Sequence, residues 1–162
     1  WRATGKHRAK FSRGSRQCSA AHVKRGVAVT AAHCVHKFGK GQAGYASQIQ
    51  FWPAQYGDTV PYGVWRGRYW IVPPSYFHGG DTCEPGAAGI VCNNDLALVV
   101  LHQETGKWAG EVLGFYGYGW NGYGFAANPV WGGRTTAQVA QLGYPEAPED
   151  GKTQFRTDSV AT

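Results

Sequence analysis

The feature that most constrains the fold of this chain is the shortness of its apolar segments. Twenty-four glycines and eight prolines interrupt a sequence of 162 residues that is 43% hydrophobic. Gly, Pro, Asn and Asp favour turns, whereas β-branched and aromatic residues between them favour strands. The pattern therefore predicts an all-β fold of many short strands, arranged as a barrel or a sandwich.

The predicted strands are apolar or alternating segments, each bounded by turn residues. They are Phe11–Cys18, Gly26–Thr30, Gln48–Trp52, Val64–Val72, Leu96–Leu101, Glu111–Tyr116, Thr135–Tyr144 and Lys152–Asp158. A helical turn is expected only in the tract after His33. The glycine- and aromatic-rich segment 114–133 is expected to form a strand and a wide turn that pack their rings on a core. A boundary near residues 102–106 divides the chain into parts 1–105 and 106–162.

Cysteine and methionine usage bears on the cellular location. No apolar run approaches the ~18 residues of a membrane-spanning helix, so we expect a soluble protein with no membrane partner. The chain has four cysteines and no methionine. The missing start methionine is expected after removal of a signal peptide or pro-segment, and an even number of cysteines favours an oxidising compartment. The sequence predicts a secreted or periplasmic protein, with a cytosolic protein holding reduced thiols as the alternative.

Positive charge is concentrated in the first third of the chain. The first 57 residues contain ten Lys and Arg and no Asp or Glu, whereas the rest contain six cations and ten carboxylates, a net charge of −4. Such a basic block can attract nucleic acid or another anionic polymer. Because no nucleic-acid-binding motif accompanies the charge, a solvated surface is favoured and nucleic acid is an unexpected partner. An anionic-polymer or nucleic-acid binder remains an alternative function.

His33 lies at the end of the apolar segment VTAAHC (residues 29–34). It is a packed structural residue, a metal ligand or a catalytic base. A zinc site built from Cys18, His33, Cys34 and His36 is one alternative. Adjacent residues of an extended backbone point to opposite faces, which makes it difficult for His33 and Cys34 to bind one ion. We therefore expect no metal site.

Asp95 precedes an apolar strand in the segment NNDLALVVL (residues 93–101). A carboxylate in that position is costly to bury unless it accepts hydrogen bonds, and a histidine is a natural partner. A carboxylate on one imidazole nitrogen fixes the tautomer and leaves the other nitrogen to take a proton from a nucleophile. Asp58 and Asp81 are competing candidates, but neither precedes an apolar strand.

The two segments together resemble the histidine and aspartate motifs of chymotrypsin-fold, trypsin-like serine peptidases, in which the histidine also comes first. The later segments GFYGYGW, QLGYPEAP and TQFRTDS are similar to the second-barrel region of bacterial glutamyl endopeptidases. The resemblance covers the chain from about residue 5 to residue 158. It implies a double antiparallel β-barrel, with the first barrel in 1–105 and part of a second in 106–162.

The resemblance also assigns roles to residues. His33 would be the general base and acid, and Asp95 the carboxylate that orients it. Cleavage after acidic residues is implied by the glutamyl endopeptidase branch, although the pocket for the residue before the scissile bond would be formed largely by segments around the serine. No cofactor is implied.

The cysteines are assigned in pairs. By the resemblance, Cys18 and Cys34 would form the disulfide behind the histidine. Cys83 and Cys92 lie nine residues apart in a Gly/Pro-rich insertion before Asp95, and we expect them to bond to each other. This second disulfide is a feature of this chain rather than of the family.

The nucleophile of the family is absent from these residues. It lies in a Gly-x-Ser-Gly-Gly turn whose backbone N–H groups also form the oxyanion hole. No serine of the chain has that surrounding: Ser12, Ser15, Ser19, Ser47, Ser75 and Ser159. Because an unfinished barrel exposes unpaired strand edges, we expect a C-terminal peptidase chain carrying the motif as partner, and a peptide or protein substrate. The serine would otherwise lie in a C-terminal part that is missing from this sequence. The alternative is a non-catalytic, peptidase-like binding protein.

Overall fold

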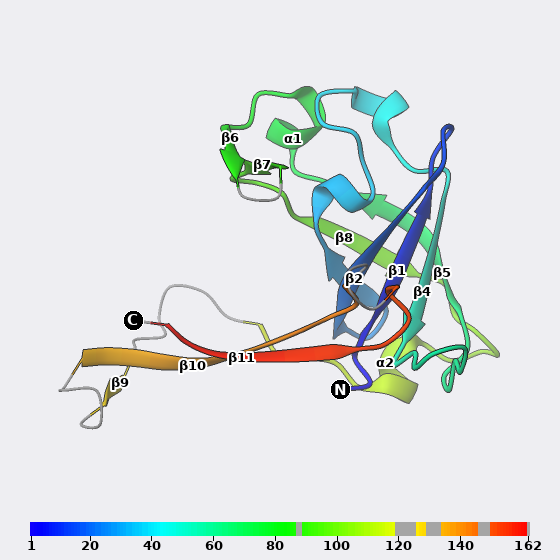
Figure 1. Cartoon of the computed structure of the whole chain (residues 1–162). Coiled ribbons are helices and arrows are strands. Elements are labelled where there is room, and N and C mark those ends of the chain that lie inside the picture. The colour runs from blue at the N-terminus through cyan, green and yellow to red at the C-terminus, as the bar shows by residue number, and fades with distance from the viewer. Residues whose placement is uncertain (87–88, 119–125, 129–133, 146–149, 162) are drawn as a thin grey trace.

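A closed antiparallel barrel forms the body of the molecule in the computed structural model, which describes residues 1–86, 89–118, 126–128, 134–145 and 150–161 (Figure 1). Around the barrel the strands follow the order β1 (Thr4–Lys10), β2 (Ser15–Lys24), β3 (Val27–Thr30), β8 (Ala97–Leu101), β5 (Trp65–Ile71) and β4 (Gln48–Pro53). Each strand pairs with the next, and β4 pairs with β1. Closure leaves this sheet without a free edge.

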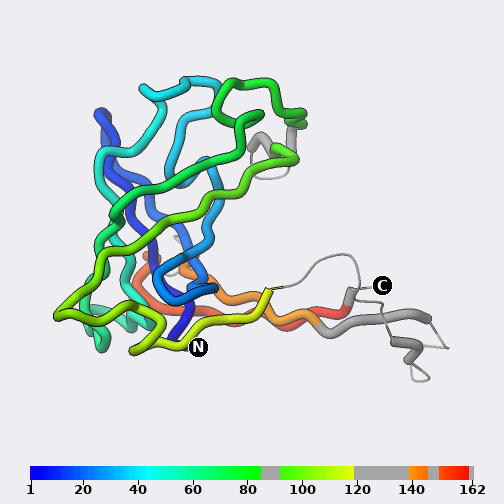
Figure 2. Tube along the Cα trace, turned by 180° about the vertical axis from the view of Figure 1, so that it is seen from behind, coloured from blue at the N-terminus to red at the C-terminus, as the bar shows by residue number. Residues whose placement is uncertain are grey.

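A second, open sheet extends from the barrel, as both ribbon views show (Figures 1 and 2). It has the order β11 (Phe155–Ala161), β10 (Arg134–Gly143) and β9 (Ala126–Asn128). Tyr144, directly after β10, fixes this sheet to the barrel. Its backbone N–H donates to Ser19 Oγ at 2.8 Å, and its buried hydroxyl donates to the Gln55 carbonyl at 3.2 Å.

The barrel core follows the two-residue period of its strands. Ile49 and Phe51 of β4 are buried, as are Val99 and Leu101 of β8. The inward positions of β1 carry small or polar residues instead, and one of them, Gly5, lies so close to the core that a Cβ would be 2.5 Å from the Phe51 ring. Ile49, Phe51, Val99 and Leu101 belong to one continuous hydrophobic cluster.

Short helices and a hairpin lie at the two ends of the barrel, with α2 (Ala109–Leu113) at the end opposite the others (Figure 1). The 3₁₀ turns η1 (Ala32–Cys34) and η2 (Gly41–Gly44) follow β3, and helix α1 (Pro74–His78) follows β5. The hairpin of β6 (Cys83–Gly86) and β7 (Gly89–Cys92) precedes β8, and helix α2 follows it. Within the described ranges, no helix is long and apolar enough to cross a membrane.

The structure confirms the all-β class and a helical turn after His33, but α1 and α2 show that this turn is not the only helical segment. Three predicted strands are corrected, and one of them, predicted at Lys152–Asp158, begins at Phe155. The strand predicted at Phe11–Cys18 begins later, at Ser15, and an unpredicted strand, β1, precedes it. The strand predicted at Glu111–Tyr116 is wrong, because residues 109–113 form helix α2. There the Glu111 carboxylate accepts the Trp108 backbone N–H at 2.7 Å, which caps the first turn of the helix.

The aromatic segment 114–133 lies largely outside the described residues. In its described part, Phe115 and Tyr118 are exposed rather than packed on a core. Tyr116 makes a hydrogen bond through its hydroxyl with Thr4 Oγ1 at 3.0 Å. The predicted division at residues 102–106 stays a prediction; β8 ends at Leu101, and a tight turn closed by backbone hydrogen bonds between Glu104 and Lys107 follows.

Candidate active site

The pairing of β3 with β8 brings the two predicted catalytic residues together. The strands are antiparallel, and Thr30 at the end of β3 lies opposite Ala97 at the start of β8. His33 lies three residues beyond Thr30, and Asp95 lies two residues before Ala97. Both therefore project from the same end of one strand pair, although 62 residues separate them in sequence.

Asp95 holds His33 at two points. Its Oδ2 lies 2.7 Å from His33 Nδ1, and its Oδ1 accepts the backbone N–H of His33 at 2.8 Å. Both carboxylate oxygens are thus engaged, which satisfies a carboxylate whose side chain is only 21% exposed. The contact assigns the proton of the neutral ring to Nδ1 and leaves Nε2 as the acceptor nitrogen.

His33 is open to solvent on its other side. Its side chain is 55% exposed. Nε2 lies 3.4 Å from Cys34 Sγ, a disulfide sulfur that carries no proton to donate. The basic nitrogen is therefore accessible to a group outside the barrel.

Two contacts fix the backbone behind His33. Cys34 is buried and forms a disulfide with Cys18 of β2. The Arg16 guanidinium, also on β2, donates to the His33 carbonyl oxygen. The turn that carries the histidine is thus tied to β2 by one covalent bond and one charge-assisted hydrogen bond.

The β6–β7 hairpin fixes the approach to Asp95. Cys83 and Cys92 are opposite each other in the register and form a disulfide. Asp81, just before the hairpin, accepts the backbone N–H of Asn94 at 2.7 Å and its side-chain amide at 2.8 Å. The residue before Asp95 is therefore held through both its main chain and its side chain.

The competing carboxylates serve other contacts. Asp81 binds Asn94 as described, and Asp58 pairs with the Lys152 ammonium at 3.0 Å. Neither contacts His33 among the residues that the structure describes. From the sequence, Asp81 was a candidate only for the orienting carboxylate. Its role in holding the segment before Asp95 was missed, because the sequence does not show which residues pair across the hairpin.

Neither cysteine of the alternative zinc site, Cys18 or Cys34, is available as a thiolate ligand. Cys18, His33 and Cys34 do lie together, but both sulfurs belong to the disulfide. His36 is buried, and its Nε2 lies 2.7 Å from the Gly41 carbonyl oxygen. The ligand set that a zinc site would require is thus committed to other bonds.

A pocket of about 450 Å³ adjoins His33. Its lining residues are Arg16, His33, Lys37, Phe38, Tyr76, Cys83 and Cys92. Burial, and to a lesser extent the Asp95 carboxylate, raises the pKa of Tyr76 to about 12. Tyr76 therefore presents a neutral ring to the pocket, and the pocket's cations are Arg16 and Lys37, which the sequence did not single out from the rest of the basic block.

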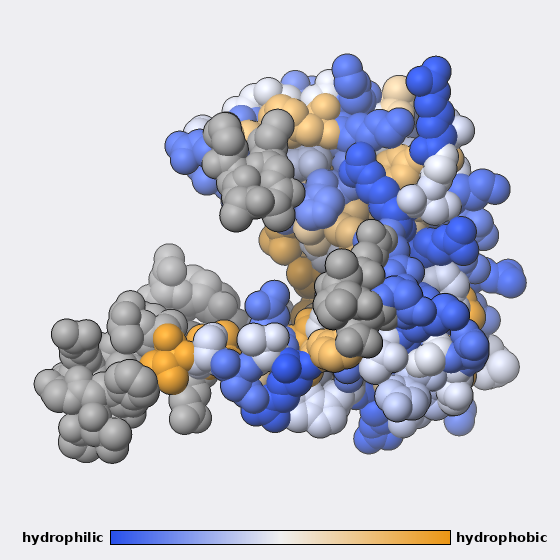
Figure 3. Space-filling model, in the orientation of Figure 1, coloured by the Kyte–Doolittle hydropathy of each residue, from blue (hydrophilic) through white to orange (hydrophobic). Residues whose placement is uncertain are grey.

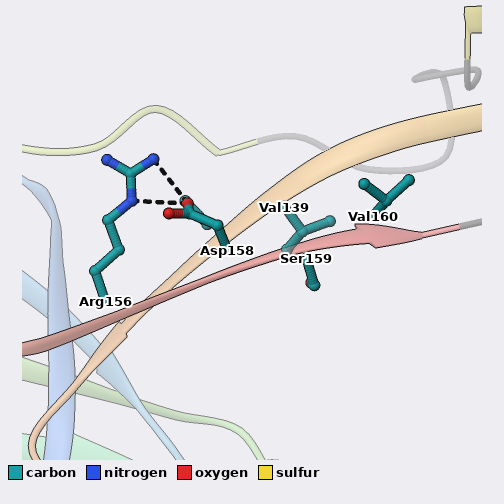
Figure 4. A pocket seen from close by; sticks show the side chains of 6 residues that line it. Val139, Arg156, Asp158, Ser159 and Val160 are labelled. Carbon is teal, nitrogen blue, oxygen red and sulfur yellow. Dashed lines mark hydrogen bonds and ion pairs between the residues drawn. The ribbon is translucent and has the colours of Figure 1, made fainter. Parts of the chain in front are cut away.

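A second pocket, of about 530 Å³, lies on the open β10–β11 sheet (Figure 4). Ser159 and Val160 point to opposite sides of β11, as successive residues of a strand do, and Val139 lies opposite Ser159 on β10. Arg156 and Asp158 pair with each other at 2.7 Å. No contact joins Ser159 to His33 in the described part of the chain, so this serine does not complete the pair.

Large apolar side chains are exposed on both sheets. Ile71 and Leu98 lie opposite each other on the outside of β5 and β8, and Leu96 follows Asp95. Phe155 and Val160 of β11 are also exposed. Figure 3 shows the molecule hollowed between the barrel and the second sheet, with hydrophobic residues on the inner wall of the hollow.

Comparison with known proteins finds similarity in structure only. No protein-family model and no curated protein sequence matches the chain. Protease Anisep from Arthrobacter nicotinovorans superposes with a TM-score of 0.78 at 22% identity, over 99% of this chain and 64% of that one. Thermostable serine protease AL20, from an extremophilic microorganism, gives a TM-score of 0.77 at 23% identity, over 99% and 66%.

A Glu endopeptidase superposes over the whole chain and 63% of its own length, with a TM-score of 0.66 at 17% identity. The chain thus spans less than two thirds of the length of each of these solved structures. A closed first barrel and an open second sheet agree with that comparison. The chain has the double-barrel fold of chymotrypsin-like serine proteases, with the second barrel incomplete in these residues.

Proposed function

We propose that the protein is a serine endopeptidase in which these residues supply the general base, His33, and its orienting carboxylate, Asp95. The single observation that supports this most is the two-point hold of Asp95 on the His33 ring and backbone. A histidine fixed only for packing would need neither an accessible ring nitrogen nor a carboxylate on its other one. The arrangement fits a base that must present Nε2 repeatedly in one orientation.

The proposed reaction proceeds through an acyl-enzyme. His33 Nε2 takes the proton of a serine hydroxyl as the oxygen attacks the substrate carbonyl carbon, and Asp95 stabilises the imidazolium that forms. The imidazolium then gives this proton to the leaving amine as the C–N bond breaks. Water repeats the sequence on the ester, with His33 again as base, and releases the carboxylic acid and the free serine.

The serine is proposed to lie in a Gly-x-Ser-Gly-Gly segment outside these 162 residues, on a C-terminal polypeptide that also completes the second barrel. Support comes from the open sheet β9–β11 and from the exposed apolar residues beside Asp95, such as Leu96 and Leu98. Strands that continue the second sheet would cover this surface and close the barrel. The two disulfides support an extracellular or periplasmic location.

Covalent labelling with a fluorophosphonate probe tests the proposal on the whole protein, including any polypeptide that accompanies this chain. We expect the probe to label a serine outside residues 1–162. His33→Ala should abolish labelling, and Asp95→Asn should lower peptide hydrolysis by roughly 10⁴-fold, because the amide favours the wrong tautomer of the ring.

The matched control is His102→Ala, since His102 is exposed and lies at the end of β8 away from the pair. It should leave labelling unchanged, and circular dichroism should show the same fold for all variants. Undiminished labelling of His33→Ala would refute the role of the base. A whole protein without any Gly-x-Ser-Gly-Gly segment would favour the non-catalytic binding protein instead.

A further inference from the structure

The pocket beside His33 carries two cations that have no carboxylate partner in the described ranges of the chain. Arg16 lies on β2 and Lys37 lies just after η1. Ion pairs in those ranges involve other residues. Within the described ranges, neither cation of the pocket wall is therefore part of an ion pair.

Both cations contact the same aromatic ring, that of Phe11. The Arg16 guanidinium carbon lies 5.0 Å from the centre of the Phe11 ring, and the Lys37 ammonium nitrogen lies 5.7 Å from the same centre. Phe11 is buried and thus a fixed platform. Cation–π contacts of this kind stabilise each cation. Because both cations line one pocket, an anion bound in that pocket would be attracted to both of them.

The rest of the pocket wall is rigid and apolar. The Phe38 ring packs edge-on against buried Tyr76, with 5.2 Å between the ring centroids, and the Cys83–Cys92 disulfide also lines the pocket. An apolar wall with a charged end fits a side chain that has a methylene stem and an anionic head. The Arg16 guanidinium donates from one nitrogen to the His33 carbonyl oxygen, and its remaining N–H groups can bind a carboxylate, to which Lys37 adds a second positive charge.

We propose that Arg16 and Lys37 form a subsite for an acidic side chain of the peptide substrate, at a position next to the scissile bond. The inference rests on the proposed function, because it is His33, on the rim of the same pocket, that would place the scissile bond there. All lining residues come from the first barrel and the hairpin before β8. The subsite is thus separate from any pocket that the serine-bearing segment forms for the residue before the scissile bond.

Equilibrium binding to the whole protein carrying His33→Ala tests the subsite without turnover. The probes are short peptides with one glutamate moved through each position, and matching peptides with glutamine there. We expect one position at which glutamate binds about 3- to 10-fold more tightly than glutamine, the range for a partly exposed charge-assisted contact. Lys37→Gln should bring this ratio close to unity, and added salt should lower it.

The matched control is Lys40→Gln. Lys40 lies three residues after Lys37, is exposed and is not among the residues that line the pocket, so this variant removes the same charge at a different place. It should keep the glutamate preference. Arg16→Gln should also remove the preference, and its effect on the His33 backbone is checked by the circular dichroism of the variant.

A glutamate preference that is absent, or that survives Lys37→Gln and Arg16→Gln, overturns the subsite. Peptide cleavage by the enzyme with its histidine intact is measured separately. Binding that follows the charges without any cleavage supports the subsite and counts against the proposed peptidase, whereas cleavage with no charge-dependent binding does the reverse.

Discussion

The pH dependence of stability should be traceable to His7, a histidine inside the first barrel. His7 faces inward on β1, opposite Phe51 of β4, and is 1% exposed. Its Nε2 has no hydrogen-bond partner among the described residues. Because burial disfavours the charged ring, the pKa of His7 is lowered from 6.5 to about 4.

The direction and size of the effect of His7 on the free energy of unfolding follow from proton linkage. In the unfolded chain His7 binds a proton near pH 6.5, but in the folded barrel only near pH 4. Between these values the unfolded state holds more protons, so acid favours unfolding. Since one pKa unit corresponds to about 1.4 kcal/mol, His7 should remove about 3 kcal/mol of unfolding free energy as the pH falls from 6.5 to 4.

The test replaces His7 with leucine, which has a similar size and no titrating group. Urea unfolding of wild type and His7→Leu is measured across pH 4–7, with His102→Gln as a control that keeps the wild-type slope. His22 leaves a residual slope in the variant, because burial lowers its pKa too, partly opposed by its hydrogen bond to the Gly114 carbonyl. Parallel profiles for wild type and His7→Leu would refute the reasoning.

If His7→Leu fails to fold, NMR titration of the His7 ring in the wild type reads the same quantity directly. A midpoint near 6.5 in the folded protein would contradict the assignment, since the calculation depends on the low pKa of the buried ring.

Three further predictions concern stability, each measured by urea unfolding at neutral pH. Replacing Cys83 and Cys92 with alanine should cost about 3 kcal/mol from loop entropy; an unchanged midpoint contradicts this. Gly5→Ala should cost about 1–3 kcal/mol by overpacking, whereas Gly80→Ala, with no atom within 4 Å of the new Cβ, should cost far less; equal losses would exclude a steric cause. Tyr144→Phe should cost about 1 kcal/mol through its lost hydrogen bond to the barrel.

The strands that the sequence predicted well are those with large inward side chains. β4 alternates buried Ile49 and Phe51 with less buried residues, and its predicted and observed bounds differ by one residue. β1 was missed because its inward residues are Gly5, His7 and Ala9. None of these is a large apolar residue. The side chains of β1 therefore alternate between inside and outside in the structure, but the sequence shows no clear alternation of apolar and polar residues.

The helix α2 was predicted as a strand because its apolar residues were taken for an extended segment. Ala109 and Leu113, four residues apart, are the buried pair, which is a helical rather than an extended spacing. The proline and glycine that bound α1, at Pro74 and Gly79, were also available as start and stop signals. Short helices of this size give too few turns for a clear period.

The pair His33 and Asp95 was predicted by local context, but its geometry depends on strand register. Nothing local indicates that Thr30 lies opposite Ala97, because register is set by closure of the whole barrel. The same holds for Arg16 and Lys37, which reach one pocket from separate elements. Contacts between residues that are far apart in the sequence therefore could not be predicted from it.

The pairing of β3 with β8 has a consequence for how the proposed activity would be lost. β3 is only four residues long, and it pairs with β2 on one side and with β8 on the other. The β3–β8 pair ends next to the contact between His33 and Asp95. Local opening of the β3–β8 pair would separate His33 from Asp95 while the other strand pairs remain intact. Hydrogen exchange at Ala28 and Val99 should then rise in step with the loss of the proposed peptidase activity, well before global unfolding.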